Sequence, residues 1–211
     1  NHCEIRAGNV EFRMVGMADR DFPKLADPRE VTYGKIEAAA LREFIGKTIF
    51  AVSTDETRAH LSGVLWECAG DRMRMVSTDG HRLCKIERDL HGAPALEAGV
   101  IVPRKGLLEI RRLIEDVDGA CDVGFDKGCL FVGTSAATLS VKLVDAKFPP
   151  FDQVIPKDND KIMTVDRIAL LDALRRVALV ASDRTSGVKV EVSKGAMRLS
   201  SENPDLGEAH E

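Results

Sequence analysis

The stretch SGVLWECAGDRMRMVS at residues 62–77 returns in altered form as SGVKVEVSKGAMRLS at residues 186–200. Ser-Gly-Val and Met-Arg recur in both copies, each moved by 124 positions along the chain. A second pair of landmarks, Phe22-Pro23-Lys24-Leu25 and Phe148-Pro149-Pro150-Phe151, is separated by 126 positions. A period of about 125 residues is much longer than a solenoid repeat, so each unit is expected to be a domain with its own core.

This period divides the chain into parts of three domains. Residues 1–30 are expected to be the C-terminal end of one unit, residues 31–160 a complete second unit, and residues 161–211 the N-terminal part of a third. The first residue is not methionine and the last residues hold no closing element, so both ends look cut.

The composition excludes several classes of protein. The 211 residues are 44% apolar, 30% charged and 5% aromatic, as in ordinary globular proteins. The net charge of −4 disfavours a uniformly basic nucleic-acid binder but leaves local basic faces open. Apolar runs are too short to cross a bilayer and no signal peptide is evident, so we expect a cytoplasmic protein. The five cysteines include no Cys-x-x-Cys pair, so we expect reduced thiols and no metal site.

Apolar residues at helical spacing predict two helices in the complete unit. The first runs from Leu41 to Val52, and its predicted buried face consists of Leu41, Phe44, Ile45, Thr48, Ile49 and Val52. The second begins behind Pro103 and runs from Arg104 to about Val117. Its predicted buried side consists of Leu107, Leu108, Ile110, Leu113, Ile114 and Val117. A stretch with similar spacing, 170–180, predicts a matching helix in the third unit.

Alternating residues predict the strands between these helices, at 61–67, 72–78, 123–125, 129–133 and 138–143. Asp79-Gly80 between two apolar runs predicts a hairpin with a type I′ turn, which needs positive φ. Helices laid on antiparallel sheets give an α+β fold.

Asp79 and His81 are the starting point for a catalytic interpretation, because neighbouring His and Asp can act as general acid and base. The hairpin explains the Asp-Gly pair without catalysis, and two residues on one turn need not face each other. The sequence contains no Gly-x-Ser-x-Gly nucleophile elbow, phosphate-binding loop or zinc- or calcium-binding motif. We therefore expect a binding or scaffold protein without cofactors rather than an enzyme.

The second helix is rich in cations. Between Pro103 and Glu115 it carries four basic residues and two acidic ones: Arg104, Lys105, Arg111, Arg112, Glu109 and Glu115. A solvated helix face explains this charge. If the helices face a polyanion instead, these cations would contact phosphates without reading base sequence.

Three separated motifs resemble the bacterial sliding clamp family, the beta subunit of DNA polymerase III: 78–83 (TDGHRL), 102–106 (VPRKG) and 142–149 (KLVDAKFP). The resemblance covers essentially the whole chain and implies a DNA-clamp fold, with two helices packed on antiparallel sheets in each domain. It implies an internal fragment of a three-domain protomer, two of which close head to tail into a ring around duplex DNA. Such a clamp is a non-catalytic processivity factor that tethers the polymerase, while a separate clamp loader consumes ATP.

The resemblance also implies three sets of site residues. Partner proteins would insert a peptide beside Leu61, Thr78, Gly80, His81, Arg82, Leu83, Pro149 and Val154. Duplex DNA would contact Arg58, Arg104 and Lys105, near the repelling carboxylates of Asp55 and Glu56. Leu179 and Val180 resemble an apolar patch of the homodimer interface, although they could equally be core-facing residues of a helix.

Gln153 and Thr185 depart from the cation and the aromatic residue that some relatives carry beside the peptide site. The expected partners are duplex DNA, polymerase subunits, the clamp loader and other proteins with clamp-binding peptides. The alternative is a scaffold of repeated domains that binds proteins and does not encircle DNA.

Overall fold

The computed structural model describes residues 2–22, 27–55, 57–126, 128–181 and 187–211 of the chain. The chain divides into two compact units, Asn1–Pro150 and Phe151–Glu211. Some of the residues that the sequence singled out lie outside the described residues: Pro23, Lys24, Leu25, Glu56, Thr185 and Ser186.

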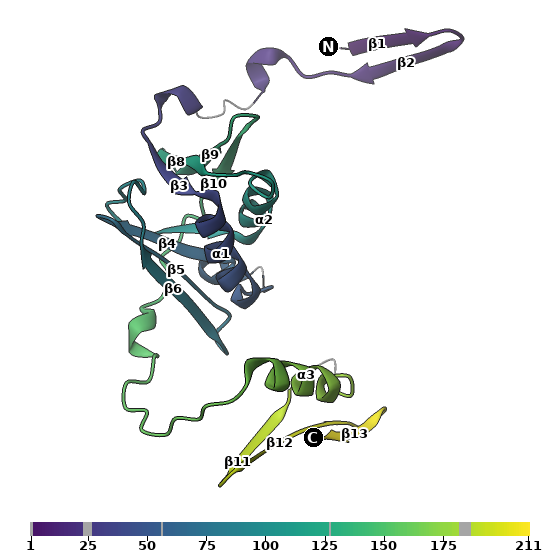
Figure 1. Cartoon of the computed structure of the whole chain (residues 1–211). Coiled ribbons are helices and arrows are strands. Elements are labelled where there is room, and N and C mark those ends of the chain that lie inside the picture. Colours follow the sequence, from purple (N-terminus) through teal and green to yellow (C-terminus); the bar gives the residue numbers. More distant parts are fainter. Residues whose placement is uncertain (1, 23–26, 56, 127, 182–186) are drawn as a thin grey trace. The chain divides into compact units, whose positions relative to one another are not determined.

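The chain begins with a hairpin of two strands, β1 (His2–Ala7) and β2 (Val10–Val15) (Figure 1). Ile5 lies opposite Phe12 on one face of this hairpin, and both side chains are exposed. Because side chains alternate along a strand, the charged residues share the other face, where they form ion pairs. The hairpin therefore has one apolar and one charged face.

Residues 33–142 contain two copies of one motif, a strand followed by a helix and three antiparallel strands. The first copy consists of β3 (Tyr33–Glu37), α1 (Ala38–Thr48), β4 (Gly63–Ala69), β5 (Arg72–Thr78) and β6 (Leu83–Asp89). The second consists of β7 (Val100–Pro103), α2 (Arg104–Leu113), β8 (Ala120–Asp126), β9 (Cys129–Gly133) and β10 (Thr138–Lys142). Helices packed on antiparallel sheets confirm the predicted α+β fold.

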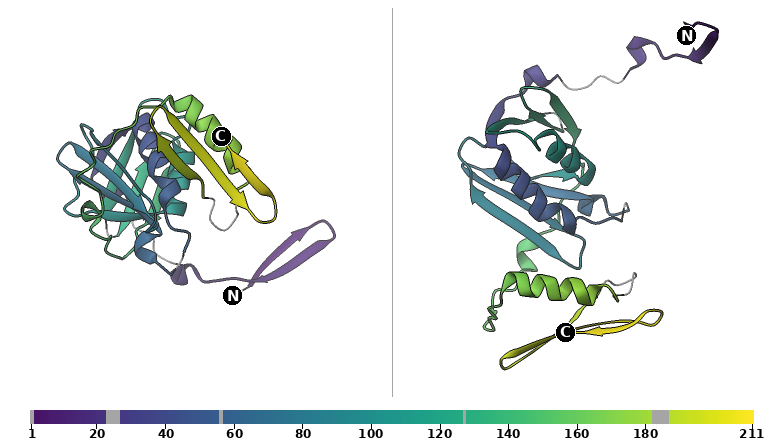
Figure 2. Two further views of the ribbon diagram at one scale, coloured as in Figure 1. Left: turned by 90° about the horizontal axis from the view of Figure 1, so that it is seen from below. Right: turned by 45° about the vertical axis from the view of Figure 1, so that its right-hand side comes forward.

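The two copies exchange their first strands. Strand β3 pairs with β8 and β7 pairs with β4, which gives four-stranded sheets in the orders β10-β9-β8-β3 and β6-β5-β4-β7. Helix α1 packs against β5 and β6, α2 packs against β10, and the two helices are in contact (Figure 2). Each half of the domain thus supplies an edge strand to the other half.

Matched positions of the two copies form one core between the helices and the sheets. Strand β4 corresponds to β8 with an offset of 57 residues, which relates Trp66 to Val123. Strand β3 corresponds to β7 with an offset of 66 residues, which relates Ile36 to Val102. All four side chains are buried in the same cluster. The sequence analysis missed this internal two-fold relation because residue types differ at the paired positions.

The first predicted helix has the buried face that its spacing indicates. All six predicted positions are buried, although the α-helix runs from Ala38 to Thr48 and a 3₁₀ turn, Ile49–Ala51, replaces the last predicted turn. The buried hydroxyl of Thr48 donates a hydrogen bond to the Phe44 carbonyl at 2.8 Å, so it is satisfied within the helix. Further 3₁₀ turns lie at Asp19–Asp21, Pro28–Glu30, Ala59–Leu61 and Phe151–Gln153.

Helix α2 ends earlier than predicted, at Leu113 rather than about Val117. The guanidinium of Arg42, on the neighbouring helix α1, donates to the carbonyl of Ile114 and to that of Val117 at 3.2 Å. The Ile114 carbonyl also accepts from the Val117 amide at 3.3 Å, so Arg42 and this turn together satisfy the helix end.

One residue assigned to the buried side of α2 is exposed. Leu108 is 40% exposed, because at 3.6 residues per turn it lies nearly opposite Ile110 and Gly106 on the helix. Gly106 is buried instead, and it brings α2 close to Val141 of β10.

The second unit repeats one helix and three strands. It consists of α3 (Arg167–Ala178), β11 (Lys189–Ser193), β12 (Ala196–Asn203) and β13 (Gly207–His210), with the strands in sequential antiparallel order. The Asp166 carboxylate caps α3 by accepting a hydrogen bond from the Ala169 amide at 2.7 Å. Among the described helices, none has both the length and the apolar stretch that a bilayer crossing needs.

A buried serine makes the same hydrogen bond in both units. Ser77 of β5 donates to the carbonyl of Thr48 at the end of α1, and Ser201 of β12 donates to that of Val177 in α3, both at 2.6 Å. Ser201 follows Ser77 by 124 positions, the shift seen in the sequence. The units therefore share the way in which strand and helix end are joined.

Candidate functional site

The loop between β5 and β6 holds most of the residues expected at the peptide site. Thr78 pairs with Leu83, so the loop has four residues, Asp79 to Arg82, and not the two of the predicted type I′ turn. Within this loop Gly80 has positive φ, at 93°. The predicted hairpin is confirmed by the pairing of β5 with β6, but the two-residue turn was wrong because Asp79 closes a longer turn with its side chain.

Asp79 organises this loop through backbone hydrogen bonds. Its Oδ1 accepts from the amides of His81 and Arg82 at 2.9 and 3.0 Å. Burial alone would raise the pKa of Asp79, but these two amides and the Arg82 guanidinium hold that pKa below its usual value. Thr78 donates from Oγ1 to the Arg82 carbonyl at 2.7 Å, which closes the loop from the other side.

Arg82 joins the loop to the end of the first helix. Its Nε donates to Oδ2 of Asp79 at 3.0 Å, and its Nη2 donates to the Phe50 carbonyl at 2.7 Å. The guanidinium carbon also lies 5.9 Å from the centre of the exposed Phe50 ring. Sequence reasoning missed Phe50. The one signal in the sequence was that this aromatic residue lies outside the predicted buried face of the first helix.

Leu61 and Arg58 lie beside this loop. Leu65 is opposite Val76 in the sheet, so β4, which follows Leu61 closely, starts where β5 ends. A Cβ added to Gly80 would lie 3.5 Å from the guanidinium of Arg58. Leu61 is buried, with its amide donating to the Arg58 carbonyl at 2.8 Å.

The other expected peptide-site residues are partly or fully accessible. Leu83 and Pro149 are half-buried in the first unit, whereas Val154 belongs to the second unit and is 67% exposed. The structure thus brings together Leu61, Thr78, Gly80, His81, Arg82 and Leu83 around one loop, and Arg58 joins them.

The geometry gives no support to a catalytic pair at this loop. Asp79 bonds to the backbone amide of His81, and its second oxygen is paired with Arg82. In the described ranges no three His, Cys, Asp or Glu side chains are grouped as a metal site would require. Burial raises the pKa of the Cys121 thiol to about 11, so this thiol is protonated at neutral pH.

Helix α2 presents an exposed basic surface. Within the described residues its four cations, Arg104, Lys105, Arg111 and Arg112, are exposed and have no ion pair. Most other helix-associated cations are paired: Lys47 with Glu43 at 3.6 Å and Arg175 with Asp172 at 3.4 Å. Arg58, expected beside DNA, is also paired, with Asp55 at 3.2 Å. Unpaired positive charge therefore concentrates on α2.

Leu179 and Val180 follow the end of α3. Leu179 is 80% exposed and Val180 is half-buried. The exposure of Leu179 fits a surface patch better than a core position, and Val180 remains compatible with either.

Family models of two domains match the chain. The model described as DNA polymerase III beta subunit, central domain, matches residues 35–150, and the C-terminal domain model matches residues 152–211. The beta sliding clamp of Pseudomonas putida KT2440 is 33% identical over 209 residues, which are 98% of this chain and 56% of that protein. The chain thus spans little more than half the length of the curated relatives that it matches.

Solved structures give the same result. A DNA polymerase III subunit beta from Pseudomonas aeruginosa is 33% identical, with a TM-score of 0.84 over 100% of this chain and 58% of its own. A Caulobacter crescentus beta sliding clamp, with polyethylene glycol bound to a region described as beta-motif tethering, is 34% identical, with a TM-score of 0.82 over 99% of this chain and 57% of its own.

Proposed function

The chain belongs to the family of the DNA polymerase III beta subunit, and from this premise we propose that it is part of a DNA sliding clamp. The complete gene product would form a closed homodimeric ring around duplex DNA in the bacterial cytoplasm. It would act without catalysis or cofactors, because a ring that encircles DNA is retained on the DNA by topology. The named clamps among the relatives support this proposal.

The unpaired cations of α2 carry the proposal for DNA. Arg104, Lys105, Arg111 and Arg112 are exposed on one helix, in a chain whose net charge is −4. Contacts from such residues to phosphates position a protein on DNA without reading bases. A clamp needs this kind of contact, since it must slide over every sequence. Arg58 would join them once DNA competes with Asp55 for its guanidinium.

The loop at Asp79 to Arg82 would form part of the peptide site for partners. Its backbone is held by Asp79 and Thr78, while His81 is exposed and Phe50 presents an accessible ring. A rigid surface with apolar and polar groups suits a short peptide with apolar anchors. Leu83 and Pro149 of the same unit would take part in this site, with the buried Leu61 beside the loop, and the resemblance to the family adds Val154 to the residues that the peptide would contact. Polymerase subunits and the clamp loader would be the partners.

Binding a polymerase to such a ring raises the local concentration of the polymerase at the DNA end that it extends. Tethering of this kind can raise apparent affinity by about 10²–10⁴ without any new contact. Leu179 and Val180 would contribute to closing the ring between protomers.

The experiment that tests this function measures retention on DNA. The complete gene product is loaded by its clamp loader onto nicked circular DNA, and the retained fraction is measured before and after the circle is cut. Retention that is lost on linearisation supports a topological clamp. Retention unaffected by cutting would instead favour a scaffold that does not encircle DNA, and the ring proposal would be withdrawn.

A further inference from the structure

The Arg82 side chain is held at three points by residues of its own unit. Its Nε donates to the Asp79 carboxylate at 3.0 Å, its Nη2 donates to the Phe50 carbonyl at 2.7 Å, and its guanidinium carbon lies over the Phe50 ring, 5.9 Å from the ring centre. The side chain nevertheless stays 59% exposed. Arg82 is therefore both ordered and accessible, which suits a residue that meets a partner.

The turn after α1 places Phe50 where it can hold this arginine. In the 3₁₀ turn Ile49–Ala51 the middle residue directs its ring outward, so that Phe50 is 53% exposed while its two neighbours are buried. The amide of Ser53 donates to the Leu61 carbonyl at 3.0 Å rather than back into the turn. The Phe50 carbonyl can therefore accept from Arg82, and the ring reaches the same guanidinium.

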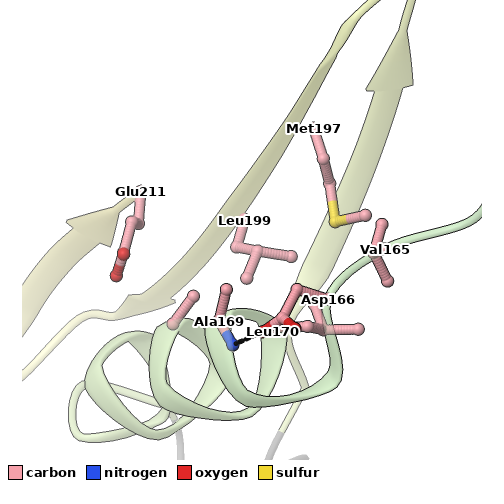
Figure 3. Close-up of a pocket in the computed structure, with 8 residues that line it drawn as sticks. Val165, Asp166, Ala169, Leu170, Met197, Leu199 and Glu211 are labelled. Carbon is pink, nitrogen blue, oxygen red and sulfur yellow. Dashed lines mark hydrogen bonds between the residues drawn. The ribbon is translucent and has the colours of Figure 1, made fainter.

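The second unit lacks this pair although it shares the surrounding joint. Helix α3 packs on β12 as α1 packs on β5, with Leu199 of β12 directed toward α3 (Figure 3). A buried serine bonds a carbonyl at the helix end in both units. Yet Leu179 stands in the place of Phe50, 129 positions later, and the loop at 203–207 contains no arginine. The joint therefore forms without the pair, so the pair calls for a reason other than the fold.

Holding an arginine in advance lowers the cost of binding to it. A long flexible side chain loses rotamer freedom when a ligand immobilises it, and this loss is smaller where the protein has already ordered the side chain. Asp79 and the Phe50 carbonyl fix the direction of the guanidinium by hydrogen bonds, while the ring attracts its charge. The ring is the one of these three groups that a substitution at position 50 can remove.

We propose that Phe50 is a positioning residue of the partner-peptide site, whose ring keeps the Arg82 guanidinium where an incoming peptide meets the loop. The inference rests on the proposed peptide site and adds to it a residue that the resemblance to the family did not supply. Phe50 acts through Arg82, so it contributes to peptide affinity without a contact of its own.

The test uses the complete gene product and a dye-labelled clamp-binding peptide from the polymerase of the same organism, with binding measured by fluorescence anisotropy. Phe50→Leu keeps the backbone carbonyl and an apolar side chain but removes the aromatic face. We expect it to weaken peptide binding about two- to fivefold, the range of an exposed cation–π contact. Phe50→Tyr keeps the aromatic face and should bind as the wild type does.

Arg82→Met separates positioning from direct contact, because it keeps a long side chain and removes the guanidinium. In this background, Phe50→Leu should cause no further loss of affinity. Leu108→Ala, at an exposed apolar position on the other helix of the first unit, is the matched control and should leave peptide affinity unchanged. Circular dichroism and size-exclusion elution check that each variant is folded and assembled.

Three results would each overturn the positioning role: a loss below twofold in Phe50→Leu, an equal loss in Phe50→Tyr, or the same loss from Phe50→Leu in the Arg82→Met background. The last result would mean that the ring contacts the peptide directly. Absence of peptide binding by the wild-type protein would instead remove the proposed peptide site, and this inference with it.

Discussion

Replacing Gly106 with alanine probes the close approach between α2 and β10. A Cβ at this position would lie 2.3 Å from Cγ1 of Val141 and 3.2 Å from its Cγ2. Carbon atoms in contact prefer about 3.5–4.0 Å, so the added methyl group cannot fit without movement. Val141 is β-branched and buried, so its side chain cannot easily rotate away.

The expected loss of stability follows from two opposing effects. Overpacking of a core costs about 1–3 kcal/mol, while alanine is favoured over glycine inside a helix by at most about 1 kcal/mol. Because the close contact is with a stiff side chain, we expect Gly106→Ala to lower the free energy of unfolding by about 1–2 kcal/mol.

Urea unfolding followed by tryptophan fluorescence measures the stability of the first unit, which contains Gly106. Trp66 is the only tryptophan in the chain and is fully buried in the core of the first unit. Its signal therefore reports the unfolding of that unit, and the slope against urea shows whether the transition stays two-state.

Val141→Ala is the matched partner for a double-mutant cycle. Alone it removes buried methyl groups and should cost about 1–2 kcal/mol, but together with Gly106→Ala it makes room for the new methyl group. We expect the double variant to lose less unfolding free energy than the two single variants lose together, by at least about 1 kcal/mol. Stabilisation by Gly106→Ala, or additivity within about 0.5 kcal/mol, would refute the steric argument.

Three further predictions concern single side chains. Ser77→Ala and Ser201→Ala each leave a buried helix-end carbonyl without its serine donor, so each should destabilise its own unit by about 1–3 kcal/mol, measured by urea titration and hydrogen exchange. In the complete gene product, Arg104→Ala with Lys105→Ala removes two cations from each protomer of the proposed homodimer, so the slope of log K for DNA against log salt should fall by up to about 4, measured by anisotropy. The folded pKa of Asp79 lies below its ordinary value, so its contribution to stability is complete above that value and is lost as pH falls through the folded pKa. Asp79→Asn should therefore reduce the acid dependence of stability below about pH 4, measured by urea titration at several pH values.

Matched controls separate these effects from general damage. Ser140, exposed on β10, should tolerate alanine within about 0.5 kcal/mol. Arg72, which is paired with Glu87 on a sheet, should leave the salt slope unchanged when replaced by alanine. Asp118→Asn, at an exposed loop position, should keep the acid dependence. A control that behaves like its test variant would contradict the corresponding assignment.

The helix faces were the most predictable feature of the fold. All six predicted positions of the first helix are buried, because the spacing of apolar residues is a local property of a helix. The same approach was wrong at Leu108, which was assigned to the buried face together with its neighbour Leu107. Leu108 is exposed, and Gly106 is buried instead. Strands β3 and β7 were missed because a short strand has little pattern of its own.

The candidate site was only partly predictable. The motif at residues 78–83 pointed to the loop, but the four-residue turn depends on hydrogen bonds from the Asp79 side chain. Phe50 and Arg82 are 32 positions apart in the sequence, so no local pattern indicates that they are in contact. The basic composition of α2 was evident from the sequence, whereas the lack of ion pairs on it was not.

By itself, the sequence determined the α+β class, the repeat of about 125 residues and the polar and apolar faces of the helices, because these depend on neighbours along the chain. Only the tertiary structure decided the exchange of β3 and β7 between the two halves of the first unit. It alone also decided which of the described helix cations are paired with carboxylates, as Lys47 and Arg175 are. Strand partners, ion pairs and burial join residues far apart in the chain, so they are determined by the packing of whole elements.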